Sequence, residues 1–342
     1  MEPRRSTGSA WHHWPQHDPL YNEPQVIEDA KSPQCGGQPG FVNTNTLGLW
    51  AGFLDQLSLP DAIATAKKIE AFGIDTIWLP EWSGVEPFIR AGLYLAATDR
   101  LTVATGVANA HARDADAMVA AASTLEASFP GRFVLGIGVS HRTVVEGRGH
   151  MFPPPLTFMR SYLDAMSLAA GSRPMPPIVL GALGPKMLQL AGSSATGAYS
   201  YFCPVAHTIA ARRLLIPRSW LISSQMVSDA SSEDWRDRVA HYMRLCLGMP
   251  NYTTNLKRFG FGARDFANPS DALVDSLVVA DSPELLKDRI ASQLQAGADH
   301  VVVQFVPPPS PLDVVTLLER NAGTLRAATK SGQASTCQGV EL

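Results

Sequence analysis

Short apolar runs with the spacing of strands alternate eight times with longer amphipathic runs that have the spacing of helices. The expected strands are Leu47–Gly52, Asp75–Leu79, Leu101–Val107, Phe133–Val139, Pro177–Gly181, Gly197–Phe202, Trp220–Met226 and His300–Val306. The helical patterns that follow them are Leu59–Phe72, Glu86–Ala97, Ala115–Phe129, Leu156–Ala170, Pro185–Gly192, Val205–Leu215, Glu233–Leu247 and Leu312–Ala327. Eight successive units with no linker halfway favour an α/β fold of the closed (β/α)₈ type, a TIM barrel, over an open doubly wound sheet.

Three segments do not follow this alternation. Residues 1–40 and 329–342 show neither the apolar repeat of a strand nor that of a helix. We therefore expect a poorly ordered tail on each side of a barrel domain over 41–328. The histidines between Trp11 and His17 lack a carboxylate-flanked pair, so no metal site is predicted there. The seventh unit is too long, and Gly248–Asp281 is expected as an insertion between strands 7 and 8. It forms a lid, a peripheral element or a dimer contact.

The composition limits the kind of ligand and the compartment. Hydrophobic residues make up 45% of the chain and charged residues 17%, which is enough apolar material for a large core. The net charge of −3 and the lack of a basic run argue against binding of nucleic acid or an anionic membrane, so a small-molecule substrate is expected. The four cysteines are far apart, which suggests neither a zinc site nor a disulfide framework. With no secretory or membrane-spanning apolar run, we expect a cytoplasmic protein.

Polar and aromatic residues follow the expected strands, where a barrel carries its reactive groups. After the second strand, Trp82 either stacks on a ring system or only packs, and Glu81 is either an acid, base or hydrogen-bond acceptor, or the partner of a basic neighbour. After the fourth strand, Gly138 allows close approach to a flat ring, and Ser140 and His141 face the mouth. His141 is the leading candidate for proton handling. The alternative is a histidine held by a neighbouring loop carbonyl.

The fifth strand runs into a short turn, Gly181–Lys186, before the next helix. Pro185 suits the first helical turn, and Gly184 leaves room for a ligand. Free backbone N–H groups at this helix start attract phosphate, and Lys186 adds positive charge unless it is simply solvated. We therefore favour a phosphate site at this turn.

Four segments together resemble the luciferase-like monooxygenase family, and the resemblance extends over Thr46–Ala327. They are IDTIWLPEW (74–82), TGVAN (105–109), GRFVLGIGVSH (131–141) and LGALGPKMLQL (180–190). More narrowly, GVSH, ALGPKML, YFCPVAHTIA, NYTTN and GADHVVVQ resemble a subgroup of oxidoreductases assigned to coenzyme F420.

The resemblance implies a barrel that holds a flavin or deazaflavin ring at the strand carboxyl ends. The residues implied to border the ring are Gly106, Val107, Gly138, Ser140 and His141. The residues implied to hold the ribityl phosphate are Ala182, Leu183, Gly184, Pro185 and Lys186, with Gly197 and Ala198. Relatives often have a histidine at the end of the second strand, where this chain has Glu81 and Trp82, and this departure leaves the proton donor open between His141 and Glu81.

These residues lead to three functional hypotheses. In the first, the chain transfers a hydride between coenzyme F420 and a small organic substrate, His141 or Glu81 handles the proton and Trp82 shapes the substrate pocket. The second is a monooxygenase that uses FMN, and the third is a noncatalytic barrel that binds a flavin. A homodimer is suggested only by the resemblance.

Overall fold

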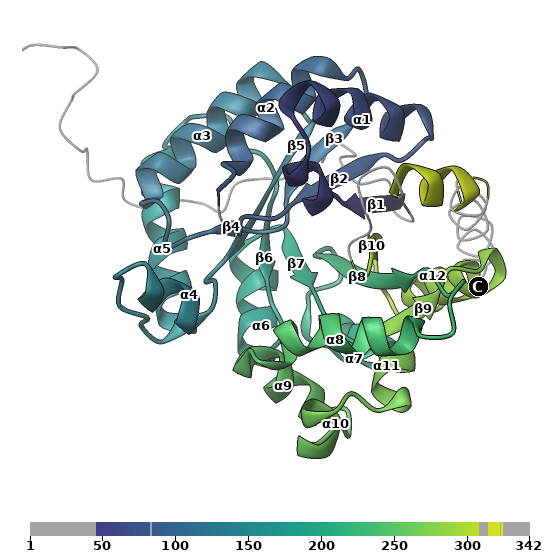
Figure 1. Cartoon of the computed structure of the whole chain (residues 1–342). Coiled ribbons are helices and arrows are strands. Elements are labelled where there is room, and N and C mark those ends of the chain that lie inside the picture. The colour runs from purple at the N-terminus through teal and green to yellow at the C-terminus, as the bar shows by residue number, and fades with distance from the viewer. Residues whose placement is uncertain (1–45, 83, 308–313, 322, 324–342) are drawn as a thin grey trace, which may run out of the picture. The chain divides into compact units, whose positions relative to one another are not determined.

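Eight parallel strands form a closed barrel (Figure 1). The computed structural model describes residues 46–82, 84–307, 314–321 and 323; the expected tails lie outside these residues. β10 pairs in parallel with both β1 and β8 and so closes the ring, which confirms the expected barrel. In order around the ring the strands are β1 (Thr46–Trp50), β2 (Thr76–Leu79), β3 (Thr102–Thr105), β5 (Phe133–Gly138), β6 (Ile178–Gly181), β7 (Gly197–Ser200), β8 (Trp220–Ser228) and β10 (His300–Phe305).

Helices follow the strands close to the ranges that the sequence predicts. Three of them start at side-chain caps: Ser58, Glu86 and Asp114 each accept a backbone N–H from the first turn that follows. The helices are α1 (Leu59–Ala71), α2 (Pro87–Ala97), α3 (Ala115–Ser128), α5 (Pro155–Ala170), α6 (Pro185–Ser194), α7 (Val205–Leu214) and α12 (Pro283–Gln295), and 314–321 is also helical. Short elements at the ends of strands are a 3₁₀ helix (Gly52–Gln56), β4 (Ala108–Asn109) and α4 (Arg142–Gly147).

The helix that completes the seventh unit is α12, and the assignment of Glu233–Leu247 to this place was wrong. A helix does form there, α8 (Trp235–Leu247), but it packs against other helices that lie between β8 and β10. α12 packs against β8, β10 and α7. Its buried Gln293 accepts hydrogen bonds from Thr208 of α7 (2.7 Å) and Ser223 of β8 (3.0 Å). The prediction took the first amphipathic run after the strand, whereas the chain makes a long excursion before it returns to the barrel.

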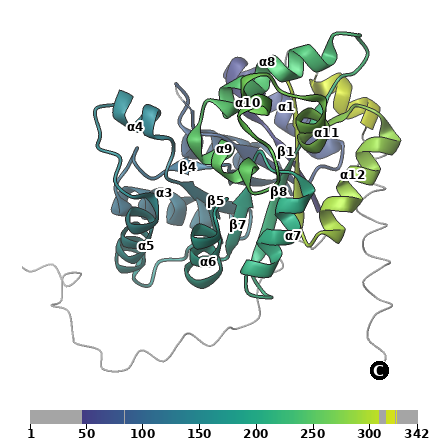
Figure 2. The same cartoon turned by 90° about the horizontal axis from the view of Figure 1, so that it is seen from below.

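We call the segment 235–280 the excursion. It comprises α8, α9 (Pro250–Lys257), α10 (Ala263–Ala267), α11 (Asp271–Leu277) and β9 (Val278–Ala280), which pairs with β8. Its apolar side chains form a hydrophobic cluster with Phe202, Met226 and Val306, which lie at or just beyond the carboxyl ends of β7, β8 and β10. Figure 2 shows the excursion helices at the same end of the barrel as α4. The excursion is therefore anchored on the mouth of the barrel.

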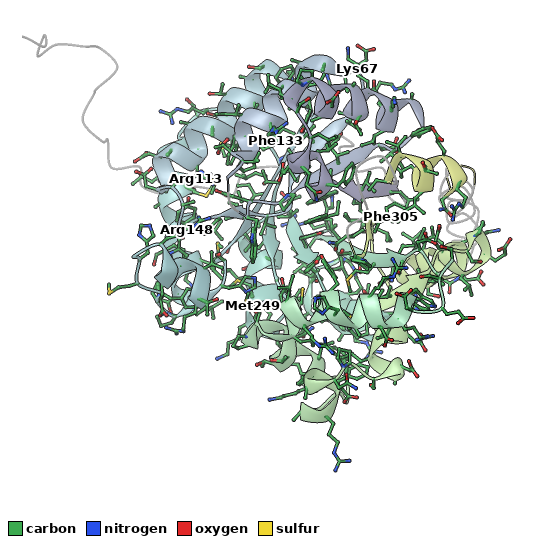
Figure 3. All side chains as sticks on the ribbon, in the orientation of Figure 1. Lys67, Arg113, Phe133, Arg148, Met249 and Phe305 are labelled. Carbon is green, nitrogen blue, oxygen red and sulfur yellow. The ribbon has the colours of Figure 1, made fainter. Side chains whose placement is uncertain are left out.

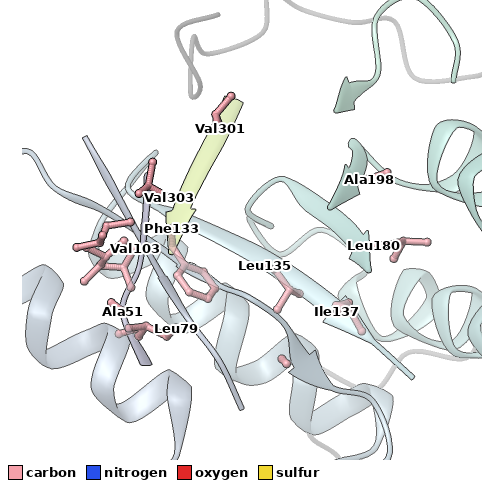
Figure 4. Packing of buried hydrophobic residues seen from close by; sticks show 14 of the residues in the cluster. Ala51, Leu79, Val103, Phe133, Leu135, Ile137, Leu180, Ala198, Val301 and Val303 are labelled. Carbon is pink, nitrogen blue, oxygen red and sulfur yellow. The ribbon is translucent and has the colours of Figure 1, made fainter. Parts of the chain in front are cut away.

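The strands bury apolar side chains on both of their faces, as a parallel barrel requires. Phe133, Leu135 and Ile137 belong to the large core between the strands and the outer helices (Figure 4). Val134 lies between them in sequence and belongs to a separate cluster with Trp78 and Tyr199. This second cluster fills the inside of the barrel, so the barrel is a packed core and not a pore.

A pair of large rings inside the barrel depends on a glycine in β1. Trp78 stacks on Tyr199 with ring centroids 5.0 Å apart, and its indole N–H donates to Nε2 of His300 at 3.1 Å. A Cβ atom on Gly48 would lie 2.5 Å from Nε2 of His300 and 2.8 Å from Nε1 of Trp78. Any side chain at position 48 therefore forces the hydrogen-bonded pair apart.

The substitution Gly48→Ala should lower the free energy of unfolding by about 1–3 kcal/mol, because it overpacks the barrel interior. Gly147→Ala is the matched control, since a Cβ there meets nothing within 4 Å and lies in the last turn of a helix. Urea denaturation of both variants checks this. A Gly48→Ala protein as stable as the wild type would contradict the packing described here.

Candidate active site

The carboxyl ends of β2, β3, β5 and β6 lie next to one another in the ring, so their loops form one continuous side of the mouth. Most of the residues singled out in the sequence lie on these loops. They include Glu81 and Trp82 after β2, Gly106 and Val107 after β3, Ser140 and His141 after β5, and Ala182–Lys186 after β6. The topology thus brings together residues that are up to about a hundred positions apart in the sequence.

Glu81 is paired with a basic neighbour, one of the two alternatives for this residue. Its two carboxylate oxygens accept hydrogen bonds from the guanidinium of Arg113 at 2.7 and 2.8 Å, and one of them also accepts the backbone N–H of Asn109 at 2.7 Å. Both side chains are largely buried, at 10% and 14% exposure. A second carboxylate, Glu86, contacts Arg113 at 3.0 Å. Glu81 therefore fixes the turn after β4, and hydrogen-bond donors of the protein occupy both of its carboxylate oxygens.

Trp82 lies at the rim of the mouth with 60% of its surface exposed. Its backbone carbonyl accepts a hydrogen bond from Arg148 at 2.7 Å, which links the loop after β2 to the end of α4. Figure 3 labels Arg148 and Arg113, which donate hydrogen bonds to two consecutive residues of this loop, Trp82 and Glu81. The indole ring is thus available to a ligand at the rim, and it is not part of the barrel core.

The glycines near the ends of β3 and β5 make room for the protein itself. A Cβ on Gly138 would lie 2.5 Å from a methyl group of Val107, and a Cβ on Gly136 would collide with the carbonyl oxygen of Thr105. The Gly106–Val107 peptide bond is cis. The space beside Gly138 is therefore taken by Val107, whose side chain packs against the cluster inside the barrel. The sequence suggests that Gly138 makes room for a cofactor ring, whereas in the structure it makes room for the side chain of Val107.

His141 is directed away from its own helix and toward the excursion. Ser140 has a φ of +58°, in the left-handed region that non-glycine residues rarely occupy, and it turns the chain sharply after β5. His141 then occupies the N-cap position of α4 without capping it. Its Nδ1 lies 3.1 Å from Oδ1 of Asn251, and its ring centroid lies 5.5 Å from that of Tyr252. Burial lowers the pKa of His141, so the imidazole is neutral at pH 7 and can accept a proton.

The start of α6 has the features of an anion site. Gly184 is the N-cap, Pro185 is the first helical residue, and no side chain caps this end. The guanidinium nitrogens of Arg258, at the end of α9, lie 3.7 and 3.9 Å from the position of a Cβ on Gly184. Lys186 lies in the same first turn. A helix N-terminus without a side-chain cap and the guanidinium of Arg258 therefore meet at this point, and Lys186 adds a positive charge to the same turn of the chain.

Two residues proposed for the phosphate lie at the other end of the barrel. Gly197 is the first residue of β7 and pairs with Val179 and with Trp220, the first residue of β8. A Cβ on Gly197 would collide with the backbone of Trp220, which explains the glycine. Since the mouth is at the carboxyl end of β7, near Tyr201 and Phe202, we do not include Gly197 and Ala198 in the site.

Sequence reasoning gave no site role to three candidate residues: Asn251 and Tyr252 in α9, and Arg258 at its C-terminal cap. The signals were the excess length of the seventh unit and, for Asn251 and Tyr252, the motif NYTTN (251–255), but neither signal says where the excursion packs. Among residues 46–82, 84–307, 314–321 and 323, no group of three His, Cys, Asp or Glu side chains could hold a metal ion. Within the same residues, no helix has the length and apolarity to cross a membrane.

Comparisons with known proteins point in one direction. A model of the luciferase-like monooxygenase family matches residues 45–300. A Mycobacterium tuberculosis protein whose name proposes a coenzyme F420-dependent oxidoreductase is 31% identical over 167 residues, which are 48% of this chain and 47% of that protein. The 5,10-methylenetetrahydromethanopterin reductase of Methanolobus tindarius is 27% identical over 153 residues, covering 39% of this chain and 47% of that protein. The chain thus spans about half the length of these curated relatives.

Solved structures share the fold. An F420-dependent secondary alcohol dehydrogenase, in complex with an F420–acetone adduct, has a TM-score of 0.65 at 14% identity, over 82% of this chain and 99% of that chain. The oxygenating constituent of 3,6-diketocamphane monooxygenase from Pseudomonas putida, in complex with FMN, has a TM-score of 0.63 at 14% identity, over 83% and 98%. At these identities the likeness supports the closed parallel barrel alone.

The substitution Glu81→Gln should lower the free energy of unfolding by about 1–3 kcal/mol, because it leaves the largely buried Arg113 with a weakened partner. Glu146→Gln is the control. It breaks an exposed ion pair with Arg142, whose side chains are 62% and 49% exposed, and should cost no more than about 0.5 kcal/mol. Denaturant unfolding measures both. Equal losses would show that the Glu81–Arg113 pair does not hold the loops together.

Proposed function

The chain belongs to the luciferase-like monooxygenase family, and we propose that it is an oxidoreductase that transfers a hydride between coenzyme F420 and a small organic substrate. The observation that carries the proposal is the pairing of two groups on adjacent loops. An anion site at the start of α6 follows β6, and a neutral histidine, His141, follows the neighbouring strand β5. The start of α6 can bind the phosphate of a cofactor, and His141 can accept and return the proton that is transferred in the reaction.

The residues at the mouth fit a phosphate-bearing cofactor. Gly184, Lys186 and Arg258 would hold the phosphate, since a helix N-terminus and two cations together favour a dianion. Val107 and Gly106, beside His141 on the same side of the mouth, would border the ring. Ala182 is already bonded within the sheet: its N–H donates to the carbonyl of Tyr199, and its carbonyl accepts from Ser200. Ala182 therefore supports the turn and leaves the phosphate contacts to Gly184–Lys186.

A deazaflavin supplies a hydride carried on a ring carbon and reacts poorly with oxygen. The neutral imidazole of His141 takes up the proton when an alcohol-like substrate is oxidised and returns it in the reverse direction. Glu81 keeps the loops after β2 and β4 in place through Arg113. Trp82, exposed at the rim, would provide an apolar wall for the substrate.

A monooxygenase reaction with FMN is the second candidate. The observation in its favour is the similar TM-score of a monooxygenase solved in complex with FMN. The anion site suits the phosphate of either cofactor, and the name of the Mycobacterium tuberculosis relative favours F420. The homodimer suggested by the family resemblance stays a prediction.

Titration of the purified protein with coenzyme F420 and, separately, with FMN tests the proposal through fluorescence quenching. We expect a dissociation constant in the micromolar range or below for F420 and much weaker binding of FMN. Arg258→Ala should weaken F420 binding about tenfold, because it removes a charge-assisted contact to the phosphate. Lys257→Ala, its exposed neighbour in α9, should change binding by less than about twofold. The reverse cofactor preference would favour the monooxygenase, and oxygen uptake would be the next assay.

His141→Ala should lower turnover about 10²–10⁴-fold and change the dissociation constant of F420 by less than about threefold, because proton transfer is lost and cofactor contacts remain. Isopropanol as hydride donor and cyclohex-2-en-1-one as acceptor are suitable probes, each monitored by F420 absorbance. Unchanged turnover with a probe that the wild type converts would remove His141 from the mechanism.

A further inference from the structure

Helix α9 of the excursion touches the loops that follow three neighbouring strands. Near its start, Asn251 contacts His141 after β5. Next to Asn251, in the first turn, the ring of Tyr252 lies 5.3 Å from that of Phe202 and 5.8 Å from that of Tyr201, after β7. At its end, Arg258 approaches Gly184 after β6. The helix therefore runs across this side of the mouth, and its residues are close enough to act on groups that belong to the barrel.

His141 makes its side-chain hydrogen bond to Asn251 and not to the helix that it precedes. An N-cap histidine normally has free N–H groups of its own helix to face, but the side chain of His141 makes no cap hydrogen bond. The positive φ of Ser140 directs the chain into this arrangement. The result is a ring with Nδ1 at 3.1 Å from the amide oxygen of Asn251, while Tyr252 packs beside it.

The geometry points to Asn251 as a positioning residue for His141. Its amide oxygen accepts the Nδ1 proton and so fixes the tautomer in which Nε2 is the bare nitrogen. This inference rests on the proposed role of His141 in proton transfer. It assigns part of the catalytic arrangement to the excursion, a segment that the barrel itself does not need.

The chemistry of an amide explains why this position suits an asparagine. A neutral amide orients the imidazole without adding negative charge, so burial can keep the ring neutral and ready to accept a proton at Nε2. From α9, the Asn251 amide and the Tyr252 ring face the imidazole. On its own helix, Arg142 is paired with Glu146 at 2.8 Å. A carboxylate in place of the amide would stabilise the imidazolium and raise the pKa of His141.

A purely structural role for Asn251 makes different predictions. If Asn251 only fastened α9 to the barrel, its loss would loosen the helix without selecting a tautomer, and an aspartate would serve as well as an asparagine. The side chain of Asn251 is exposed, and Tyr252, Asn255 and Leu256 anchor α9 through buried contacts. Removal of the amide should therefore leave the fold intact.

The experiment uses the full chain, labelled with ¹⁵N in its histidine rings, and long-range ¹H–¹⁵N NMR. The signal of His141 is assigned by its loss in His141→Gln. In the wild type we expect Nδ1 to carry the proton and Nε2 to be bare. Asn251→Ala should remove this preference, and Asn251→Asp should raise the titration midpoint of His141 by about one pH unit or more. Thr254→Ala, an exposed change on the same helix, should alter neither property.

Two results would overturn the inference: a wild-type ring protonated at Nε2 with Nδ1 bare, or a tautomer that stays the same in Asn251→Ala. The measurement needs neither F420 nor a substrate, so it is independent of the proposed function. Failure to bind F420 with the expected tautomer intact would refute the function alone. For a probe that the wild type converts, Asn251→Asp should also shift the pH profile of kcat/KM upward, whereas a loosened helix would lower kcat/KM at every pH.

Discussion

The parallel pairing of β10 with both β1 and β8 is the constraint on which the site depends. It closes the ring and forces the carboxyl ends of eight strands onto one rim. Glu81, His141 and Gly184 are separated by long stretches of chain and reach the same side of the mouth only because β2, β3, β5 and β6 follow one another in this ring. The interior supports closure with Trp78 stacked on Tyr199 and bonded to His300, packing that Gly48 makes possible by having no side chain.

The excursion between β8 and β10 adds to this frame without altering it. The barrel continues through α12, which packs against β8 and β10 and whose buried Gln293 accepts a hydrogen bond from Ser223 of β8. The excursion is fixed instead by apolar contacts with Phe202, Met226 and Val306 at the mouth. In this arrangement α9 places Asn251 beside His141 and Arg258 beside Gly184. These two contacts support the alternative in which the segment acts as a lid.

Much of the fold and part of the site could be predicted from the sequence. The repeat of apolar residues within a strand or helix depends only on nearby sequence, so it predicts the strands and most of the helices. The ends of the predicted strands then indicate His141 and the turn before α6 as candidate site residues. What failed depends on long-range packing. The family resemblance implies that Gly197 binds the phosphate, although it begins its strand and a Cβ there would collide with the backbone of Trp220. Nothing in the sequence indicates Arg258, and the motif NYTTN (251–255) does not show which barrel loop Asn251 contacts. The sequence indicates that position 138 has no room for a side chain, but the group that occupies the space beside Gly138 is the side chain of Val107.

We propose that a phosphate at the start of α6 and a proton at His141 belong to one cofactor-dependent reaction. A crystal structure of the protein with bound coenzyme F420 would test this directly. We expect the phosphate to lie within hydrogen-bond distance of the first turn of α6 and of Arg258, with Nε2 of His141 facing the substrate side of the ring. A phosphate bound elsewhere, or a ring beyond the reach of His141, would contradict it.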